Sequence, residues 1–137
     1  MICKYKNPKG FALSQLFFTF TKIKIPSSVT SIGYSSFSEC SSLTQIIMPD
    51  SVTNIGEYAF SKCTALKEIN ISTSVTKIGK YAFSQCINLI KVTIPSSVNS
   101  FGQSCFESCG KLEEVIILSP ITSIEAFFSK IVHRWNK

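Results

Sequence analysis

The chain has 137 residues, a formal net charge of +6, 45% hydrophobic residues and 16% charged residues. The positive charge is concentrated towards the two ends, because the first 24 residues contain five lysines and no acidic residue while the central part is nearly neutral. A nucleic-acid-binding protein would show a basic stripe along one face, so this distribution argues against nucleic acid as a partner. No run approaches the roughly 18 apolar residues that a transmembrane span requires, and the length is that of one domain.

The first 23 residues allow two interpretations. Three lysines precede an apolar run, which is the order found in a signal peptide, but no small-residue cleavage site is obvious after it. The segment GFALSQ at residues 10–15 closely matches GKYAFSQ at residues 79–85, so this stretch also looks like the second half of a repeat. We expect residues 1–23 to form an N-terminal partial repeat or cap. Cys3 within this segment is the best candidate for a reactive thiol.

Four copies of one 23-residue pattern fill residues 24–115. A repeat of this length indicates a solenoid, in which each coil packs on its neighbours. The shared pattern is I-P-x-S-V-x-x-I-G-x-x-A-F-x-x-C-x-x-L-x-x-I, and its last part continues into the next copy with alternating apolar and polar residues. That alternation is the period of a strand with one buried face. Stacked in register, the copies predict a parallel sheet with one short strand per coil.

The middle of each copy predicts the interior of the coil. A recurring glycine is most simply explained by a turn with positive φ, which a side chain would penalise. A small residue and a phenylalanine follow, and we expect a turn or short helical segment whose rings stack as a ladder in the core. The glycines are Gly33, Gly56, Gly79 and Gly102, and the phenylalanines are Phe37, Phe60, Phe83 and Phe106.

Each copy also carries one cysteine, namely Cys40, Cys63, Cys86 or Cys109. A 23-residue spacing fits no zinc motif. Neighbouring coils would place these cysteines about 4.7–4.9 Å apart, which is close enough for disulfide bonds. A ladder of buried thiols that act as small apolar side chains is the favoured interpretation. Cys105 stands where the other copies have serine or alanine, so it is also expected to be a small buried residue.

Residues 116–137 depart from the repeat. Thr122 and Glu125 have the spacing of a capping box, which marks the start of a helix. Three apolar residues then share one helical face: Phe128, Ile131 and Trp135. We expect a partial repeat followed by a C-terminal helix that covers the open end of the solenoid. The alternative is a basic amphipathic helix that makes weak contact with a membrane surface.

The repeated motif, most complete at residues 48–66 and 71–89, resembles the BspA-like leucine-rich repeat of the Treponema pallidum type. The resemblance covers residues 24–115 without a gap. It implies a leucine-rich-repeat solenoid that serves as a binding scaffold and not as an enzyme. Members of this family are often surface proteins of bacteria and protist parasites, and several are linked with adhesion to host matrix. The implied function is therefore surface adhesion, and the alternative is an intracellular scaffold or a truncated array from a larger protein.

No constellation of catalytic residues stands out. We find no phosphate-binding loop, no paired carboxylates at a fixed spacing and no nucleophile motif, so we expect neither enzymatic activity nor a metal or cofactor. His133 is the only histidine, and no acidic residue or serine is arranged around it in a catalytic pattern. Asn70-Ile71-Ser72 is an N-glycosylation sequon, a short pattern that often arises by chance. Family resemblance favours a location at the cell surface or outside the cell, whereas the missing signal peptide favours the cytoplasm.

The candidate binding face consists of the strand positions that alternate with the buried ones. These positions vary from copy to copy, and their mixed charges favour a protein or peptide partner over a polyanion. Three isoleucines at such positions also favour contact with a partner. The two columns of the face are Lys22, Gln45, Glu68, Lys91 and Glu114, and Lys24, Ile47, Asn70, Thr93 and Ile116. A flanking column holds Thr44, Lys67, Ile90 and Glu113.

Overall fold

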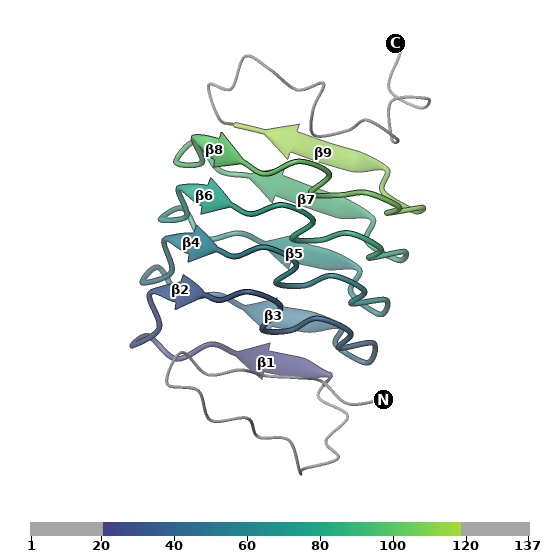
Figure 1. Ribbon diagram of the computed structural model, residues 1–137, viewed down its shortest axis with the longest axis horizontal. Coiled ribbons are helices and arrows are strands. Elements are labelled where there is room, and N and C mark those ends of the chain that lie inside the picture. The colour runs from purple at the N-terminus through teal and green to yellow at the C-terminus, as the bar shows by residue number, and fades with distance from the viewer. Residues whose placement is uncertain (1–20, 119–137) are drawn as a thin grey trace.

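The computed structural model describes residues 21–118, and in this range the chain winds into stacked coils of 23 residues (Figure 1). Each coil carries two short strands. The strands of the first series are β1 (Lys22–Lys24), β3 (Gln45–Ile47), β5 (Glu68–Asn70), β7 (Lys91–Ile94) and β9 (Glu114–Ile117). Those of the second series are β2 (Ser31–Ile32), β4 (Asn54–Ile55), β6 (Lys77–Ile78) and β8 (Ser100–Phe101).

All of the strand pairing is parallel and keeps the 23-residue register, which confirms the predicted solenoid. In the first series β1 pairs with β3, and β5, β7 and β9 form a three-stranded sheet. β3 lies next to β5 in the stack (Figure 1), although no strand ladder joins the two. The first series, with the gap in its ladder, is the sheet that the apolar-polar alternation predicts. We call its outward side the sheet face.

The second series was not predicted, because one strand per coil was expected. β2, β4, β6 and β8 form a four-stranded parallel sheet. Each of these strands has only two residues, so the sequence offers no alternation that could be recognised. Bonds beyond the strands extend the ladder: the Gly56 amide donates to the Ile32 carbonyl at 2.8 Å, and the Gly79 amide donates to the Ile55 carbonyl at 2.8 Å. In Figure 1 this sheet lies in front of the first series.

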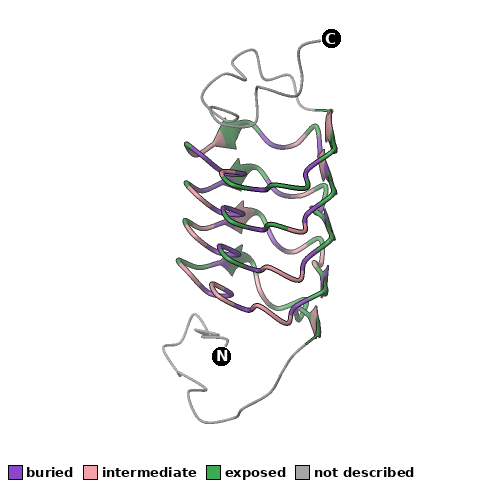
Figure 2. Ribbon diagram, turned by 90° about the vertical axis from the view of Figure 1, so that its right-hand side faces the viewer, coloured by how far each residue is buried: buried purple, intermediate pink, exposed green. Residues whose placement is uncertain are grey.

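The core lies between the two sheets, and most of its positions recur from coil to coil, with partial burial mainly at the two ends of the stack (Figure 2). The predicted phenylalanine ladder is confirmed. The rings of Phe37, Phe60, Phe83 and Phe106 stack in succession, with centroid distances of 5.2, 5.4 and 5.3 Å. Neighbouring rings are nearly parallel, with interplanar angles of 1°, 5° and 7°. Each ring is at most 2% exposed. Such stacking contributes to stability beyond the apolar area that is buried.

The segment around each phenylalanine is a series of turns, and no helix occurs within residues 21–118. Of the two expected alternatives, the turn is confirmed and the short helical segment is wrong. The amides of Ser36, Ser38 and Cys40 donate within the coil to the third residue before them. The intervening amides, such as that of Phe37 to the Ala59 carbonyl at 2.8 Å, donate to the next coil instead. An α-helix cannot form when alternate amides bond to a neighbouring coil. The predicted C-terminal helix at 122–137 lies outside the described residues.

The recurring glycines also differ from the expectation, because none of the four has a positive φ. Left-handed backbone occurs two residues later, at Ser35, Tyr58, Tyr81 and Ser104, and again at Glu39, Lys62, Gln85 and Ser108. Gly56, Gly79 and Gly102 are needed for close approach to the preceding coil. A Cβ at Gly79 would lie 2.5 Å from the amide nitrogen of Glu57 and 2.6 Å from the carbonyl carbon of Gly56. Contacts of this length with backbone atoms leave no room for a side chain.

The predicted burial of the cysteine column is confirmed, but not every member is a free thiol, because Cys40 is disulfide-bonded. Within the described range Cys63, Cys86, Cys105 and Cys109 are free thiols, and each is at most 4% exposed. Cys40 is buried at the start of the same column. Thiols in successive coils donate at 3.2 Å to a phenylalanine carbonyl 26 residues earlier: Cys63 to Phe37, Cys86 to Phe60 and Cys109 to Phe83. The cysteines are therefore more than apolar filler, because their thiols bind one coil to the next.

Candidate functional site

The sheet face carries all ten residues of the two predicted columns. The buried members of the same strands, such as Ile46, Ile69 and Val92, belong to the core. The residues of the two columns point away from the core and are exposed, except that Thr93 and Ile116 are half-buried. Pairing keeps the columns straight, since Glu68 lies opposite Lys91 and Lys91 lies opposite Glu114. The face is thus a rigid array with variable side chains at fixed spacing.

Electrostatics on the sheet face are balanced. The Lys91 ammonium lies 2.9 Å from the Glu114 carboxylate, and the two side chains are 46% and 51% exposed. An exposed ion pair of this kind stabilises the fold little, typically by 0–1 kcal/mol. Its larger effect is on recognition, because Glu68, Lys91 and Glu114 present charges of alternating sign across three adjacent strands. A partner with the complementary order of charges would bind in one register.

Apolar contact area on the sheet face is modest. Ile47 is 38% exposed, and Ile90 in the flanking column is 40% exposed. The flanking column itself, Thr44, Lys67, Ile90 and Glu113, is exposed throughout. Its backbone continues the pairing of the strands: the Ile90 amide donates to the Lys67 carbonyl at 2.8 Å, and the Glu113 amide donates to the Ile90 carbonyl at 2.9 Å. The column therefore extends the usable face beyond the strands.

Other candidate residues fall outside this surface. Cys3 and His133 lie outside the described residues. Asn70 of the sequon is exposed, but the Ser72 hydroxyl is buried and donates to the Asp50 carboxylate at 2.9 Å. A sequon whose hydroxyl is held in this way is a poor acceptor site in the folded chain. Within residues 21–118, no cluster of three or more histidine, cysteine, aspartate or glutamate side chains is arranged to hold a metal ion.

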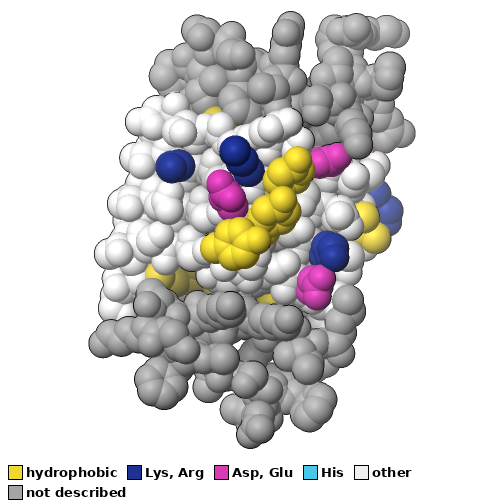
Figure 3. Space-filling view, viewed as in Figure 1, with side chains coloured by type: hydrophobic (Ala, Val, Ile, Leu, Met, Phe, Trp, Pro, Cys, Tyr) yellow, Lys and Arg dark blue, Asp and Glu magenta, His cyan; other side chains and the backbone are white. Residues whose placement is uncertain are grey.

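A stripe of tyrosines in the turns that follow the strands of the second sheet was not predicted from the sequence. Figure 3, viewed as in Figure 1, shows hydrophobic side chains running diagonally across the coils, with charged residues beside them. Tyr34 and Tyr58 meet edge to face at 5.8 Å, and Tyr58 and Tyr81 stack at 5.0 Å. Desolvation, followed by the nearby Tyr81 and Tyr34, raises the pKa of Tyr58 above its usual value. The signal in the sequence was the tripeptide Tyr-Ala-Phe at residues 58–60 and 81–83.

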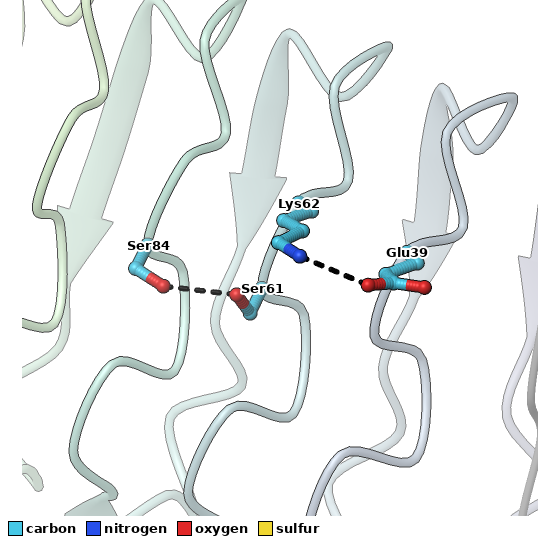
Figure 4. A network of polar contacts seen from close by, with 4 residues as sticks. All are labelled: Glu39, Ser61, Lys62 and Ser84. Carbon is cyan, nitrogen blue, oxygen red and sulfur yellow. Dashed lines mark hydrogen bonds and ion pairs between the residues drawn. The ribbon is translucent and has the colours of Figure 1, made fainter.

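Polar contacts beside the stripe tie successive coils together (Figure 4). The Lys62 ammonium lies 2.9 Å from a carboxylate oxygen of Glu39 in the preceding coil. The buried hydroxyls of Ser61 and Ser84 are 2.9 Å apart and share a hydrogen bond. Both contacts join residues 23 positions apart, so they reinforce the register of the stack. The ion pair also neutralises the charge of Lys62.

Comparison with protein families identifies the family to which this solenoid belongs. Residues 12–130 match a family described as a BspA type leucine rich repeat region (6 copies). The chain belongs to the BspA-type leucine-rich-repeat family. The match covers most of the sequence, and the resemblance inferred from the motif is confirmed. No curated protein matches the chain.

Solved leucine-rich-repeat structures agree with this assignment. A leucine-rich repeat protein from Bacteroides ovatus is 35% identical over 69% of the chain, with a TM-score of 0.66. The T. pallidum leucine rich repeat protein is 25% identical over 72%, with a TM-score of 0.61. A leucine rich cell surface protein from Faecalibacterium prausnitzii is 24% identical over 89%, with a TM-score of 0.68, and that similarity concerns the fold.

The leucine-rich-repeat chain spans only part of these relatives. It covers 24% of the B. ovatus chain, 39% of the F. prausnitzii chain and 59% of the T. pallidum chain. Within residues 21–118 there is no helix with the length and apolar character that a membrane span requires.

Proposed function

We propose that this leucine-rich-repeat array is a non-enzymatic protein-binding module whose partner docks on the sheet face. The observation that carries the proposal is the contrast between the two sides of one series of strands. The inward residues repeat almost unchanged as isoleucine or valine, whereas the outward residues range from lysine and glutamate to isoleucine and asparagine. Fixed positions with variable chemistry suit recognition of one particular protein.

The mixed charges support a protein partner. Lys22, Lys24 and Lys91 share the face with Glu68 and Glu114, so no single sign dominates. A polyanion such as nucleic acid requires a continuous positive surface. The exposed edge of Ile47 adds apolar area of the kind found at protein contacts.

The size of the face limits the affinity. Five strands spaced about 4.8 Å apart, each three or four residues long, cover roughly 20 Å by 10 Å. A standard interface buries about 800 Å² on each partner. The partner therefore has to cover the flanking column of Thr44, Lys67, Ile90 and Glu113 as well, and we expect affinity of order micromolar from this segment alone.

Adhesion at the cell surface is the biological role that family membership favours. Protease treatment of intact source cells, read out with an antibody against the repeats, tests the location. Loss of the protein from intact cells supports a surface role. Survival until the cells are lysed rejects it and favours the intracellular scaffold.

Binding itself is tested with immobilised fibronectin, laminin and collagen. The wild-type chain is compared with Lys91→Glu, which places a negative charge between Glu68 and Glu114 on the sheet face. The matched control is Lys111→Glu, the same charge reversal at an exposed position outside the sheet face. Binding that is lost in Lys91→Glu and kept in Lys111→Glu supports the sheet face. Equal binding by all three chains contradicts it.

A further inference from the structure

A shallow groove of about 530 Å³ crosses the second sheet, over β2, β4, β6 and β8. Its floor is the column of close-packed glycines: Gly33, Gly56, Gly79 and Gly102. One wall consists of the strand residues Ser31, Asn54, Lys77 and Ser100, and the other includes Tyr34, Glu57 and Lys80. The glycine groove, as we call it, runs across four coils. A long, shallow groove of this kind suits a single extended polymer chain.

In the floor of the glycine groove, the backbone amides of the last three glycines are already hydrogen-bonded. The amides of Gly56, Gly79 and Gly102 donate to the carbonyls of Ile32, Ile55 and Ile78 at 2.8, 2.8 and 2.7 Å. A ligand here cannot add a strand to the sheet through these amides. It has to be recognised by the side chains of the walls.

Three charges along the walls have no ion pair within the described part of the chain, namely Glu57, Lys77 and Lys80. All three side chains are exposed. Lys77 and Lys80 come from the same coil, on the two sides of Gly79, and Glu57 lies in the coil before it. A ligand that complements this order carries a negative group over the third coil and a hydrogen-bond donor or positive group over the second.

The tyrosine stripe lies beside this wall. Tyr58 and Tyr81 both have φ of 55°, in the left-handed region that a bulky side chain rarely adopts. The other two coils place small residues there, Ser35 and Ser104. Tyrosine, serine, asparagine and glycine together are the composition typical of antibody-like binding surfaces.

The ring arrangement favours a peptide over a sugar chain. Binding of a sugar by an aromatic residue uses an open ring face. Tyr58 has tyrosine rings as neighbours in both adjacent coils, and its stacking with Tyr81 has an interplanar angle of 12°. What these two rings offer a ligand is therefore mainly their edges and hydroxyl groups. Glu57 in the wall, moreover, would repel an acidic polysaccharide.

We propose that the glycine groove binds an extended peptide segment of a partner protein, with a carboxylate of that segment placed against Lys77 and Lys80. The exposed Tyr34 ring, 65% accessible, forms apolar contact at the first coil. This surface belongs to the second sheet and is independent of the sheet face, so either surface can fail its test without affecting the other.

The experiment pans a phage library of random linear peptides on the intact chain and measures the affinity of a synthetic peptide from the enriched pool. We expect enriched peptides that contain an acidic residue. The double variant Lys77→Glu/Lys80→Glu should weaken the selected peptide at least about tenfold, because attraction to the carboxylate becomes repulsion. Tyr34→Ser should also weaken it. Lys111→Glu, a charge reversal at an exposed residue outside both proposed binding surfaces, should leave the affinity within about twofold of wild type.

Three outcomes would overturn the proposal. The first is no enrichment above that on an uncoated surface. The second is a selected peptide that binds the double variant as well as it binds wild type. The third is binding of heparin, tested in parallel, that depends on Lys77 and Lys80 while no peptide is enriched, which would assign the groove to a polyanion. All of the altered residues are exposed, and a thermal melt of each variant confirms that the fold is retained.

Discussion

The thiol of Cys86 donates a hydrogen bond to the carbonyl oxygen of Phe60, 26 residues earlier, at 3.2 Å. The same carbonyl accepts the amide of Cys63 within its own coil at 3.2 Å. Each phenylalanine carbonyl of this kind thus joins an internal turn to the next coil. At Cys63, Cys86 and Cys109 the thiol therefore supplies a hydrogen bond between coils that an apolar residue of similar size could not supply.

Replacement of Cys86 by alanine should lower the free energy of unfolding by about 1–3 kcal/mol. The loss combines one hydrogen bond with the small cavity left by the sulfur atom, and the site is fully buried. Urea denaturation measures the change. Cys86→Val is the companion variant, because it fills most of the volume and still removes the donor. If both variants are as stable as wild type, the thiol does not contribute to stability.

Alkaline pH should remove the contribution of the buried thiols. Desolvation raises the pKa of Cys63 from 9.0 to about 12, in spite of a backbone hydrogen bond that lowers it. The folded state therefore prefers the neutral thiol, so its contribution to stability is complete below pH 9 and declines as the pH rises towards 12. We expect the destabilisation caused by Cys63→Ala to be largest at pH 8 and to shrink by pH 11.

Denaturation of wild type and Cys63→Ala across this pH range provides the measurement. The two chains differ only at residue 63, so the difference between the two curves isolates the thiol. A difference that stays constant from pH 8 to pH 11 would contradict the raised pKa. Below pH 8 a thiol-specific reagent should modify Cys63 only after the chain is unfolded.

The phenylalanine ladder should be a main source of stability. Phe83 is fully buried and stacks on both neighbours, at 5.4 and 5.3 Å, so Phe83→Ala should cost about 3–5 kcal/mol. Tyr81→Ala removes a ring that is only half-buried, two residues away, and should cost about 0.5–1.5 kcal/mol. Thermal melts of the two variants side by side test the assignment of the inward face. Equal losses would show that the Phe83 ring is not a core residue.

The sheet face could be predicted from the sequence because its strands have the period of two that one-sided burial imposes. Ile46 and Ile69 are buried and Gln45 and Glu68 are exposed, as that period requires. The strands of the second sheet, such as β4, are two residues long and carry no such period. The helical alternative for the segment around the phenylalanines is wrong because hydrogen bonding between coils, which depends on the stack, overrides local preference.

The glycine groove could not be predicted for a related reason. Left-handed backbone is normally inferred from glycine, yet here it occurs at residues such as Tyr58 and Lys62, where the amide has to reach the next coil. The glycines instead mark where two coils approach most closely. Distances between coils follow from the stack as a whole, and a single repeat read in isolation does not contain them.

This difference in the role of glycine leads to a matched pair of substitutions. A Cβ at Gly79 would lie 2.5 Å from the Glu57 amide nitrogen, and backbone cannot move aside cheaply. Gly79→Ala should therefore destabilise the chain by about 3 kcal/mol or more. A Cβ at Gly110 would meet nothing within 4 Å, and its φ lies outside the left-handed region. Gly110→Ala should stay within about 1 kcal/mol of wild type.

Urea denaturation of both glycine variants separates close approach from turn conformation. If Gly79 were needed only for a turn with positive φ, asparagine, which tolerates that conformation, would restore most of the stability. Close approach predicts the opposite, because asparagine adds the same Cβ as alanine and further atoms beyond it. Gly79→Asn should therefore be at least as unstable as Gly79→Ala, and a recovery towards wild type would show that the backbone conformation, not the packing between coils, requires the glycine.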